Sequence, residues 1–144
     1  MMNDELKPFC RLCGGGDFVA NVISDKSFAF AVRIVKLAKF LREKKEYELS
    51  SQILKSGTSI GANVQEAQRP QSDKDFLSKM HIASKEASET QYWLKLLHAA
   101  DIISHESFID IHKDIDEIIR ILVSIVKTKE NKIKNRLRLD KGGF

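Results

Sequence analysis

The chain has 144 residues, 42% of them apolar and 31% charged, which suits one globular domain with its own core and leaves little room for two. No apolar run approaches the length of a membrane span, and no basic flank precedes an apolar run at the N-terminus, so membrane insertion and secretion are both disfavoured. We therefore expect a cytoplasmic protein, and its net charge of +4 is informative only through its distribution along the chain.

Residues 1–24 are expected to form a flexible leader. They contain Cys10 and Cys13 in a C-x-x-C pair, a spacing that occurs in zinc sites and in redox sites. A structural zinc ion needs four ligands, and the sequence has no second cysteine pair. A thioredoxin-like site needs a strand-to-helix turn within a βαβ unit, and no such unit is predicted. We therefore expect neither a metal nor a cofactor.

The segment 27–45 has the three- and four-residue apolar spacing of a helix. Its apolar positions form two rows, which together make an arc wider than one helix–helix contact needs. Such an arc predicts burial on two sides, one of them against another subunit. The polar face of the same helix carries four basic residues that are candidates for contact with phosphates: Arg33, Lys36, Lys39 and Arg42.

Three more helices are predicted, over about 48–68, 72–101 and 104–127. Ser72 and Ser104 are placed to cap the last two, and Asp73 follows in a first turn, where the helix dipole favours an acid. The connections are short, and no segment alternates with the two-residue period of a strand. The expected fold of residues 25–127 is an all-α, up-down-up-down antiparallel four-helix bundle.

Positive charge is concentrated in two segments. Residues 26–46 and 127–144 each carry seven Lys or Arg and two acidic residues, whereas the rest of the chain is mildly acidic. Such segments attract polyanions, although solvated helix faces have the same composition. Residues 128–144 are expected to form a basic C-terminal tail. In the nucleic-acid hypothesis this tail is a mobile arm with four candidate phosphate contacts: Lys132, Lys134, Arg136 and Arg138.

The histidines do not fit the di-iron sites that many four-helix bundles carry. Those sites use Glu-x-x-His on two helices, and no histidine here has a glutamate three positions earlier. His98, His105 and His112 are spaced by seven residues, but a turn near 101–104 interrupts the spacing. We expect these side chains at the surface or at helix ends.

The stretch Lys55–Ala67, KSGTSIGANVQEA, has the glycines and hydroxyls of a phosphate-binding loop. However, only three residues separate Gly57 from Gly61, no Lys-Ser/Thr follows, and the preceding segment is helical instead of a strand. The stretch is therefore predicted to be helix, whose small residues let a neighbouring backbone approach closely and offset the cost of the glycines.

Polar side chains run beside the apolar face of that helix at helical spacing. If they are buried they need partners, because unpaired polar groups are costly in a core. A buried network that fixes helix register is favoured over a catalytic role. The predicted polar seam, with its partners, comprises Ser59, Asn63, Glu66, Arg69, Lys85, Glu86 and Glu89.

Three segments together resemble the bacterial four-helix-bundle family of intervening-sequence proteins, first noticed as reading frames inside insertions of 23S ribosomal RNA genes. The segments are DKSFAFAVRIVKLAKFL, LKSGTSIGANVQEA and KEASETQYWLKLL, within a resemblance over residues 25–127. The most specific part is Ser-Ile-x-x-Asn-Val-x-Glu-Ala at 59–67, followed in order by Glu86, Glu89, Tyr92 and Trp93.

The resemblance implies a bundle that assembles into a ring, often a homopentamer. It also implies kinship with the accessory proteins of diversity-generating retroelements, which bind nucleic acid and a reverse transcriptase. Residues 1–24, with Cys10 and Cys13, lie outside the family pattern.

Three functions are therefore considered. The first is a non-enzymatic, oligomeric protein that binds nucleic acid, structured RNA above all, through the basic first helix and the C-terminal tail. The second is an assembly or adaptor protein whose surface docks a protein partner without nucleic acid. The third, ranked last, is a small enzyme that uses Asn63, Glu66 and Glu86 in a cleft.

Overall fold

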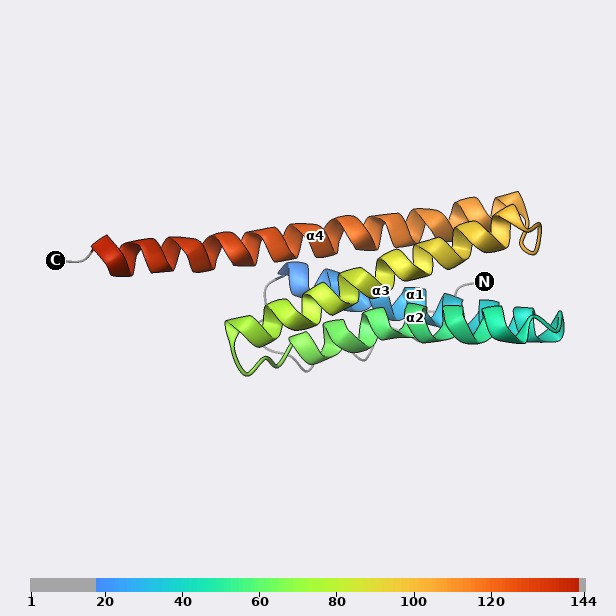
Figure 1. Cartoon of the computed structure of the whole chain (residues 1–144), viewed down its shortest axis with the longest axis horizontal. Coiled ribbons are helices and arrows are strands. Elements are labelled where there is room, and N and C mark those ends of the chain that lie inside the picture. The colour runs from blue at the N-terminus through green and yellow to red at the C-terminus, as the bar shows by residue number, and fades with distance from the viewer. Residues whose placement is uncertain (1–17, 143–144) are drawn as a thin grey trace.

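The computed structural model describes residues 18–142, and the side chains of residues 22–142. The described chain forms four helices and no strand, which confirms the predicted all-α fold (Figure 1). The helices are α1 (Phe18–Glu43), α2 (Tyr47–Ala67), α3 (Asp73–Ala99) and α4 (His105–Gly142). None of the described helices is long and apolar enough to cross a membrane.

The helices run antiparallel in chain order, as expected of an up-down-up-down bundle (Figure 1). Each helix packs against the next, and α4 closes the bundle against α1. The seam between α1 and α4 is the most sparsely packed of the four. Figure 1 also shows that α4 projects well past the ends of the other three helices.

Serine side chains begin α3 and α4 as predicted. Ser72 Oγ accepts a hydrogen bond from the backbone N–H of Asp75 at 3.0 Å, and Ser104 Oγ accepts one from Ser107 at 3.2 Å. The turns before α2 and α4 each contain a non-glycine residue in the left-handed region, Lys45 with φ 65° and Asp101 with φ 57°. The connections are short because these residues reverse the chain within a few positions.

The small residues of α2 bring it close to α1. Gly57 lies against Ile34, where an added Cβ would come within 2.7 Å of the Ile34 Cγ2 atom. Gly61 lies over the backbone of Ser27, whose carbonyl oxygen would be 3.4 Å from an added Cβ. The buried Ser50 hydroxyl donates to the Ala38 carbonyl at 2.8 Å in the same interface. The KSGTSIGANVQEA stretch is therefore a helix packed on a neighbouring helix, as predicted.

Two expected boundaries differ from the ends of the helices. α1 begins at Phe18, so the last part of the expected leader 1–24 is helical. α4 crosses position 127 without a break and ends at Gly142, so the described part of the expected mobile arm is a helix. The apolar row of α4 continues into this part at Ile133, which is partly buried. Burial of this apolar side chain favours continuation of the helix past position 127. Cys10 and Cys13 lie outside the described residues.

Candidate nucleic-acid interface

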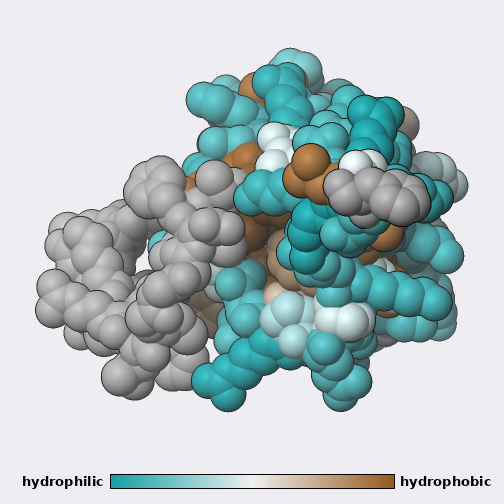
Figure 2. All heavy atoms as spheres, turned by 90° about the vertical axis from the view of Figure 1, so that its left-hand side faces the viewer, coloured by the Kyte–Doolittle hydropathy of each residue, from teal (hydrophilic) through white to brown (hydrophobic). Residues whose placement is uncertain are grey.

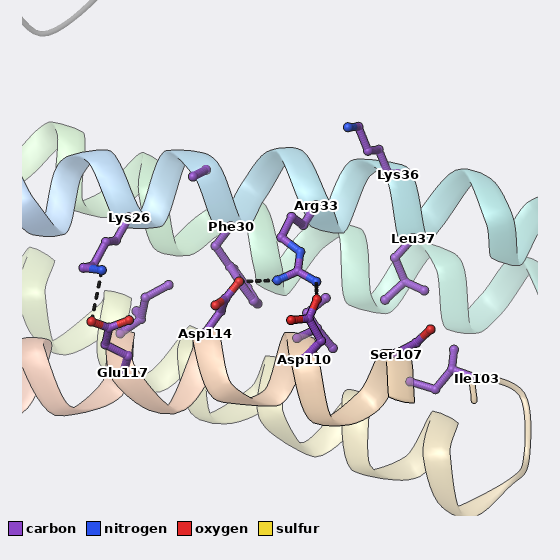
Figure 3. Close-up of a pocket in the computed structure, with 13 residues that line it drawn as sticks. Lys26, Phe30, Arg33, Lys36, Leu37, Ile103, Ser107, Asp110, Asp114 and Glu117 are labelled. Atoms are coloured by element: carbon purple, nitrogen blue, oxygen red, sulfur yellow. Dashed lines mark hydrogen bonds and ion pairs between the residues drawn. The ribbon is translucent and has the colours of Figure 1, made fainter. Parts of the chain in front are cut away.

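Arg33 lies at the centre of the α1–α4 seam and contacts α4 instead of facing solvent. Its guanidinium donates from Nη1 to Asp114 and from Nη2 to Asp110, and Lys26, two turns earlier in α1, pairs with Glu117 at 3.0 Å (Figure 3). These ion pairs bridge a groove of about 750 Å³ between the two helices. Two helices that pack loosely are thereby held together by charge.

The arrangement fixes the charge of Arg33 and assigns it a structural role. Burial alone would lower the pKa of Arg33, but the hydrogen bonds to Asp114 and Asp110 outweigh it and hold the pKa above its ordinary value. Two carboxylates already pair with this guanidinium, which leaves less of its charge for a phosphate; the phosphate contact predicted for Arg33 stays a prediction.

Arg33→Gln is expected to lower the free energy of unfolding by about 1 kcal/mol, because two carboxylates of α4 lose their common partner at a partly exposed site. Lys36→Gln, one turn along α1, should leave stability unchanged because Lys36 is exposed. Urea unfolding of both variants measures the difference. RNA affinity that falls further in Arg33→Gln than in Lys36→Gln would contradict the structural assignment.

The other basic residues of α1 remain available at the surface. Figure 3 shows Lys36 pointing away from α4, and Lys39 is also exposed. Arg42 lies over the ring of Tyr47, with its Cζ atom 5.8 Å from the ring centroid. This contact neutralises no charge, so all three remain candidates for contact with an anion.

The C-terminal candidates divide in the same way. Arg136 pairs with Asp73 at the start of α3, and Lys129 reaches the same carboxylate at 2.6 Å. Lys132, Lys134 and Arg138 are exposed. Asp73 therefore ties the last part of α4 to the bundle through Lys129 and Arg136, and we call these three residues the Asp73 anchor. Arg136 is part of this anchor and is not on a free arm.

The anchor has a pH dependence that follows from Asp73. Hydrogen bonds from Lys129 and then Arg136 hold the pKa of Asp73 below its ordinary value, so the attraction is complete above that ordinary value and is lost as the pH falls through the lowered one. We expect the helical NMR shifts of residues 129–142 to weaken as the pH falls below about 4. Shifts unchanged under these conditions would contradict the anchor.

Asp73→Asn should have the same effect at neutral pH. Its neutral side chain leaves Lys129 and Arg136 without a carboxylate, so amide hydrogen exchange over 129–142 is expected to become severalfold faster. Asp75→Asn is the matched control, since Asp75 lies in the same first turn but accepts a hydrogen bond from the Gln71 backbone N–H instead. Equal exchange rates over 129–142 in the two variants would contradict the anchor. The faster exchange would then come from loss of a negative charge at the N-terminus of α3, where the helix dipole favours an acid.

A regular series of basic residues on α4 was missed by the sequence analysis. The residues recur at intervals of seven, and all are exposed: Lys113, Arg120, Lys127, Lys134 and Lys141. A seven-residue interval falls about 20° short of two full turns, so the series winds gradually over about 80° of the outer side of α4, along about 42 Å and with positions about 10.5 Å apart along the axis. The signal was present in the sequence as spacing, but only the sum of charge in each segment was considered.

The members of the series differ in their ion pairing. Arg120 pairs with Asp116 at 2.6 Å, one turn earlier in the same helix. Among the described residues, the four lysines form no ion pair. We call them the lysine stripe: Lys113, Lys127, Lys134 and Lys141. Figure 2, viewed from the end at which α4 projects, shows hydrophilic residues over most of the coloured surface.

The predicted polar seam does not form a buried network within the described chain. Ser59 donates to the Lys55 carbonyl at 2.6 Å, and Asn63 donates to the Ser59 carbonyl at 2.8 Å, so both bond within α2. Glu66 pairs at 2.7 Å with Lys79 of α3, which the sequence analysis did not single out. This hydrogen bond raises the pKa of Lys79.

The predicted partners of the seam lie elsewhere. Glu89 accepts a hydrogen bond from Trp93 Nε1 at 3.3 Å, and Arg69 and Lys85 are exposed. Glu86 is half-buried on α3. The prediction failed because the side chains that point along α2 can bond to carbonyls of their own helix, a competitor that spacing alone does not reveal.

These features define the chain as an all-α four-helix bundle with a basic outer face on its long last helix. The family model described as 23S rRNA-intervening sequence protein matches residues 20–124. The chain belongs to this family, as the resemblance of its sequence motifs predicted. The match ends within α4, so three members of the lysine stripe follow it: Lys127, Lys134 and Lys141.

A solved structure agrees with this assignment. The chain is similar to a protein of unknown function from the S23 ribosomal protein family of Bacteroides thetaiotaomicron VPI-5482, known from a crystal structure. The two are 54% identical with a TM-score of 0.74, and the match covers 76% of this chain and 98% of the other. No curated protein matches the chain.

Proposed function

We propose that this protein is a non-enzymatic helical bundle that binds structured RNA through the outer face of α4. The observation that carries the proposal is the lysine stripe, four exposed lysines on one side of a helix that form no ion pair with any acid in the described part of the chain. Helical packing holds Lys113 and Lys127 beside the bundle, and the Asp73 anchor supports the part of α4 that carries Lys134. Cations held in a row lose less side-chain and backbone freedom on meeting a phosphate backbone than cations on a disordered tail.

The chemistry of lysine sets what such a surface recognises. An ammonium is a point charge that contacts phosphates and carries little base information, so binding should depend steeply on salt and weakly on sequence. Lys36 and Lys39 of α1 are exposed and add to the positive charge. The family description refers to 23S ribosomal RNA, which makes RNA the polyanion to test first.

Fluorescence anisotropy with a hairpin from 23S ribosomal RNA, in a salt series from about 50 to 200 mM, tests the proposal. We expect binding at low salt that weakens steeply as salt rises. A DNA duplex of equal length, measured in parallel, shows whether RNA is preferred. Absence of RNA binding at the lowest salt would overturn the proposal.

A second candidate function, assembly, rests on the outer face of α1. Phe28 is 56% exposed and Val35 39% exposed, with the half-buried Val32 between them on the same side of the helix. We infer that this stripe is a contact between copies in a homo-oligomer, with a pentameric ring as the expected form, or a docking site for a protein partner. An apolar row facing solvent is the feature that self-association would cover.

Size-exclusion chromatography with light scattering, with and without RNA, separates the two functions. A Phe28→Asp variant should become monomeric yet bind RNA at low salt if the stripe is only an assembly surface. Wild-type protein that is monomeric at all concentrations would overturn self-association. Recovery of a protein partner from lysate after nuclease treatment, without RNA affinity, would favour the adaptor.

A further inference from the structure

Two histidines meet where α3 ends and α4 begins. His98 lies in the last turn of α3, and His105 is the first residue of α4. The short connection, with Asp101 in the left-handed region, brings the two rings together: His105 Nδ1 is 3.2 Å from His98 Nε2, and the ring centroids are 5.2 Å apart. Neither RNA binding nor assembly uses this pair.

The pair is held by packing on one side and is open on the other. The His98 ring is stacked on Phe108, with centroids 4.2 Å apart and planes 1° from parallel. This stacking fixes the ring orientation of His98, which is half-buried, and leaves its Nε2 edge directed at His105. His105 is exposed, so its ring can rotate at little cost.

The facing nitrogens have the chemistry of metal ligands. Two neutral imidazoles that share one hydrogen bond place one protonated nitrogen against one lone pair, and a change of tautomer in the donor ring, with its proton moved through solvent to that ring's other nitrogen, gives two lone pairs at the same place. On a tetrahedral zinc ion with Zn–N bonds of about 2.0–2.1 Å, two nitrogens lie about 3.3 Å apart. The observed 3.2 Å matches that separation, and rotation of the exposed His105 ring would turn its lone pair toward an ion placed on the lone-pair axis of His98 Nε2.

We propose that His98 and His105 bind a zinc-class divalent transition-metal ion. Among the described residues no group of three or more His, Cys, Asp or Glu is placed to hold a metal, so the site offers two protein ligands. Its remaining positions face solvent and take water, which makes the ion exchangeable. The bound ion ties the last turn of α3 to the first turn of α4, an additional crosslink at the end of the bundle opposite the projecting part of α4.

The test is titration of Zn²⁺ into the full chain carrying Cys10→Ser and Cys13→Ser, so that the thiols do not compete, with the imidazole NMR signals as readout. The His98 and His105 signals should shift together and saturate at one ion per chain. His81, 3.6 Å from Glu130, and His112, 3.5 Å from Gln91, are internal comparators whose signals should change less.

Two variants make the test specific. His105→Ala removes an exposed ligand and should weaken Zn²⁺ binding by about tenfold or more, because the chelating pair is lost. His112→Ala, which removes the other histidine ring in contact with Phe108, should bind as before. Circular dichroism confirms that both variants fold. Signals of His98 and His105 that move no more than those of His81 and His112, or equal Zn²⁺ affinity of the two variants, would overturn the proposal.

Discussion

Replacing the four residues of the lysine stripe with alanine is expected to weaken RNA binding by about a hundredfold or more at low salt. Each phosphate contact that is lost removes about one unit from the slope of log affinity against log salt, so the slope should flatten by about three to four. Alanine keeps the helical propensity of α4, so the variant should fold. Anisotropy with the same hairpin over the same salt series measures both effects.

The matched control removes four lysines from two other helices. They are exposed residues of α2 and α3: Lys55, Lys74, Lys85 and Lys95. Their replacement with alanine lowers the net charge by the same amount, so a general charge effect would weaken both variants equally. We expect the RNA affinity of the control variant to fall severalfold at most. The slope of its log affinity against log salt should stay close to that of the wild type. Equal losses of RNA affinity in the two variants would mean that binding depends on net charge and not on the position of the lysines.

Gly57→Leu is expected to lower the free energy of unfolding by about 2–3 kcal/mol. An added Cβ would come within 2.7 Å of Ile34 Cγ2 and 2.8 Å of Cγ1. Ile34 is fully buried and β-branched, so its side chain has few alternative rotamers. The α1–α2 interface must therefore open, and this cost exceeds the gain of about 1 kcal/mol from removing a helical glycine.

Ala62→Leu is the matched control for this change. It introduces the same side chain five positions later in α2, at an exposed site, and should alter stability by less than about 0.5 kcal/mol. Urea unfolding at one fixed protein concentration compares the two, since self-association would otherwise shift the midpoint. Equal midpoints would show that α2 does not need glycine at position 57.

Local sequence signals predicted the fold well. The serines before α3 and α4 cap their helices as expected, because a cap depends on residues within one turn. The small residues of α2 predicted a close helix contact, and Gly57 makes one with Ile34. Ion pairs between residues far apart in the sequence could not be predicted from local patterns. Arg33 was assigned to a solvent-facing basic patch because its partners, Asp110 and Asp114, become visible only once the register of α1 on α4 is known.

The candidate site shows the same limit and one avoidable error. Lys129 and Arg136 pair with Asp73, across more than fifty residues of sequence, so no local pattern revealed that the end of α4 is anchored. The seven-residue spacing of the basic series on α4, by contrast, was visible in the sequence. It was missed because a helix was not expected to continue past 127, and spacing has meaning only on a continuous helix.

The location of the RNA is best tested by lysine reactivity. Full-length protein is treated with an amine-reactive acetylating reagent with and without the ribosomal RNA hairpin, and modification of each lysine is measured by mass spectrometry. We expect RNA to protect Lys127 and Lys134 strongly while Lys55 and Lys85 react as in free protein, since the two pairs lie on different helices and all four are exposed. Protection spread equally over all four lysines, or confined to Lys55 and Lys85, would contradict binding along the outer face of α4.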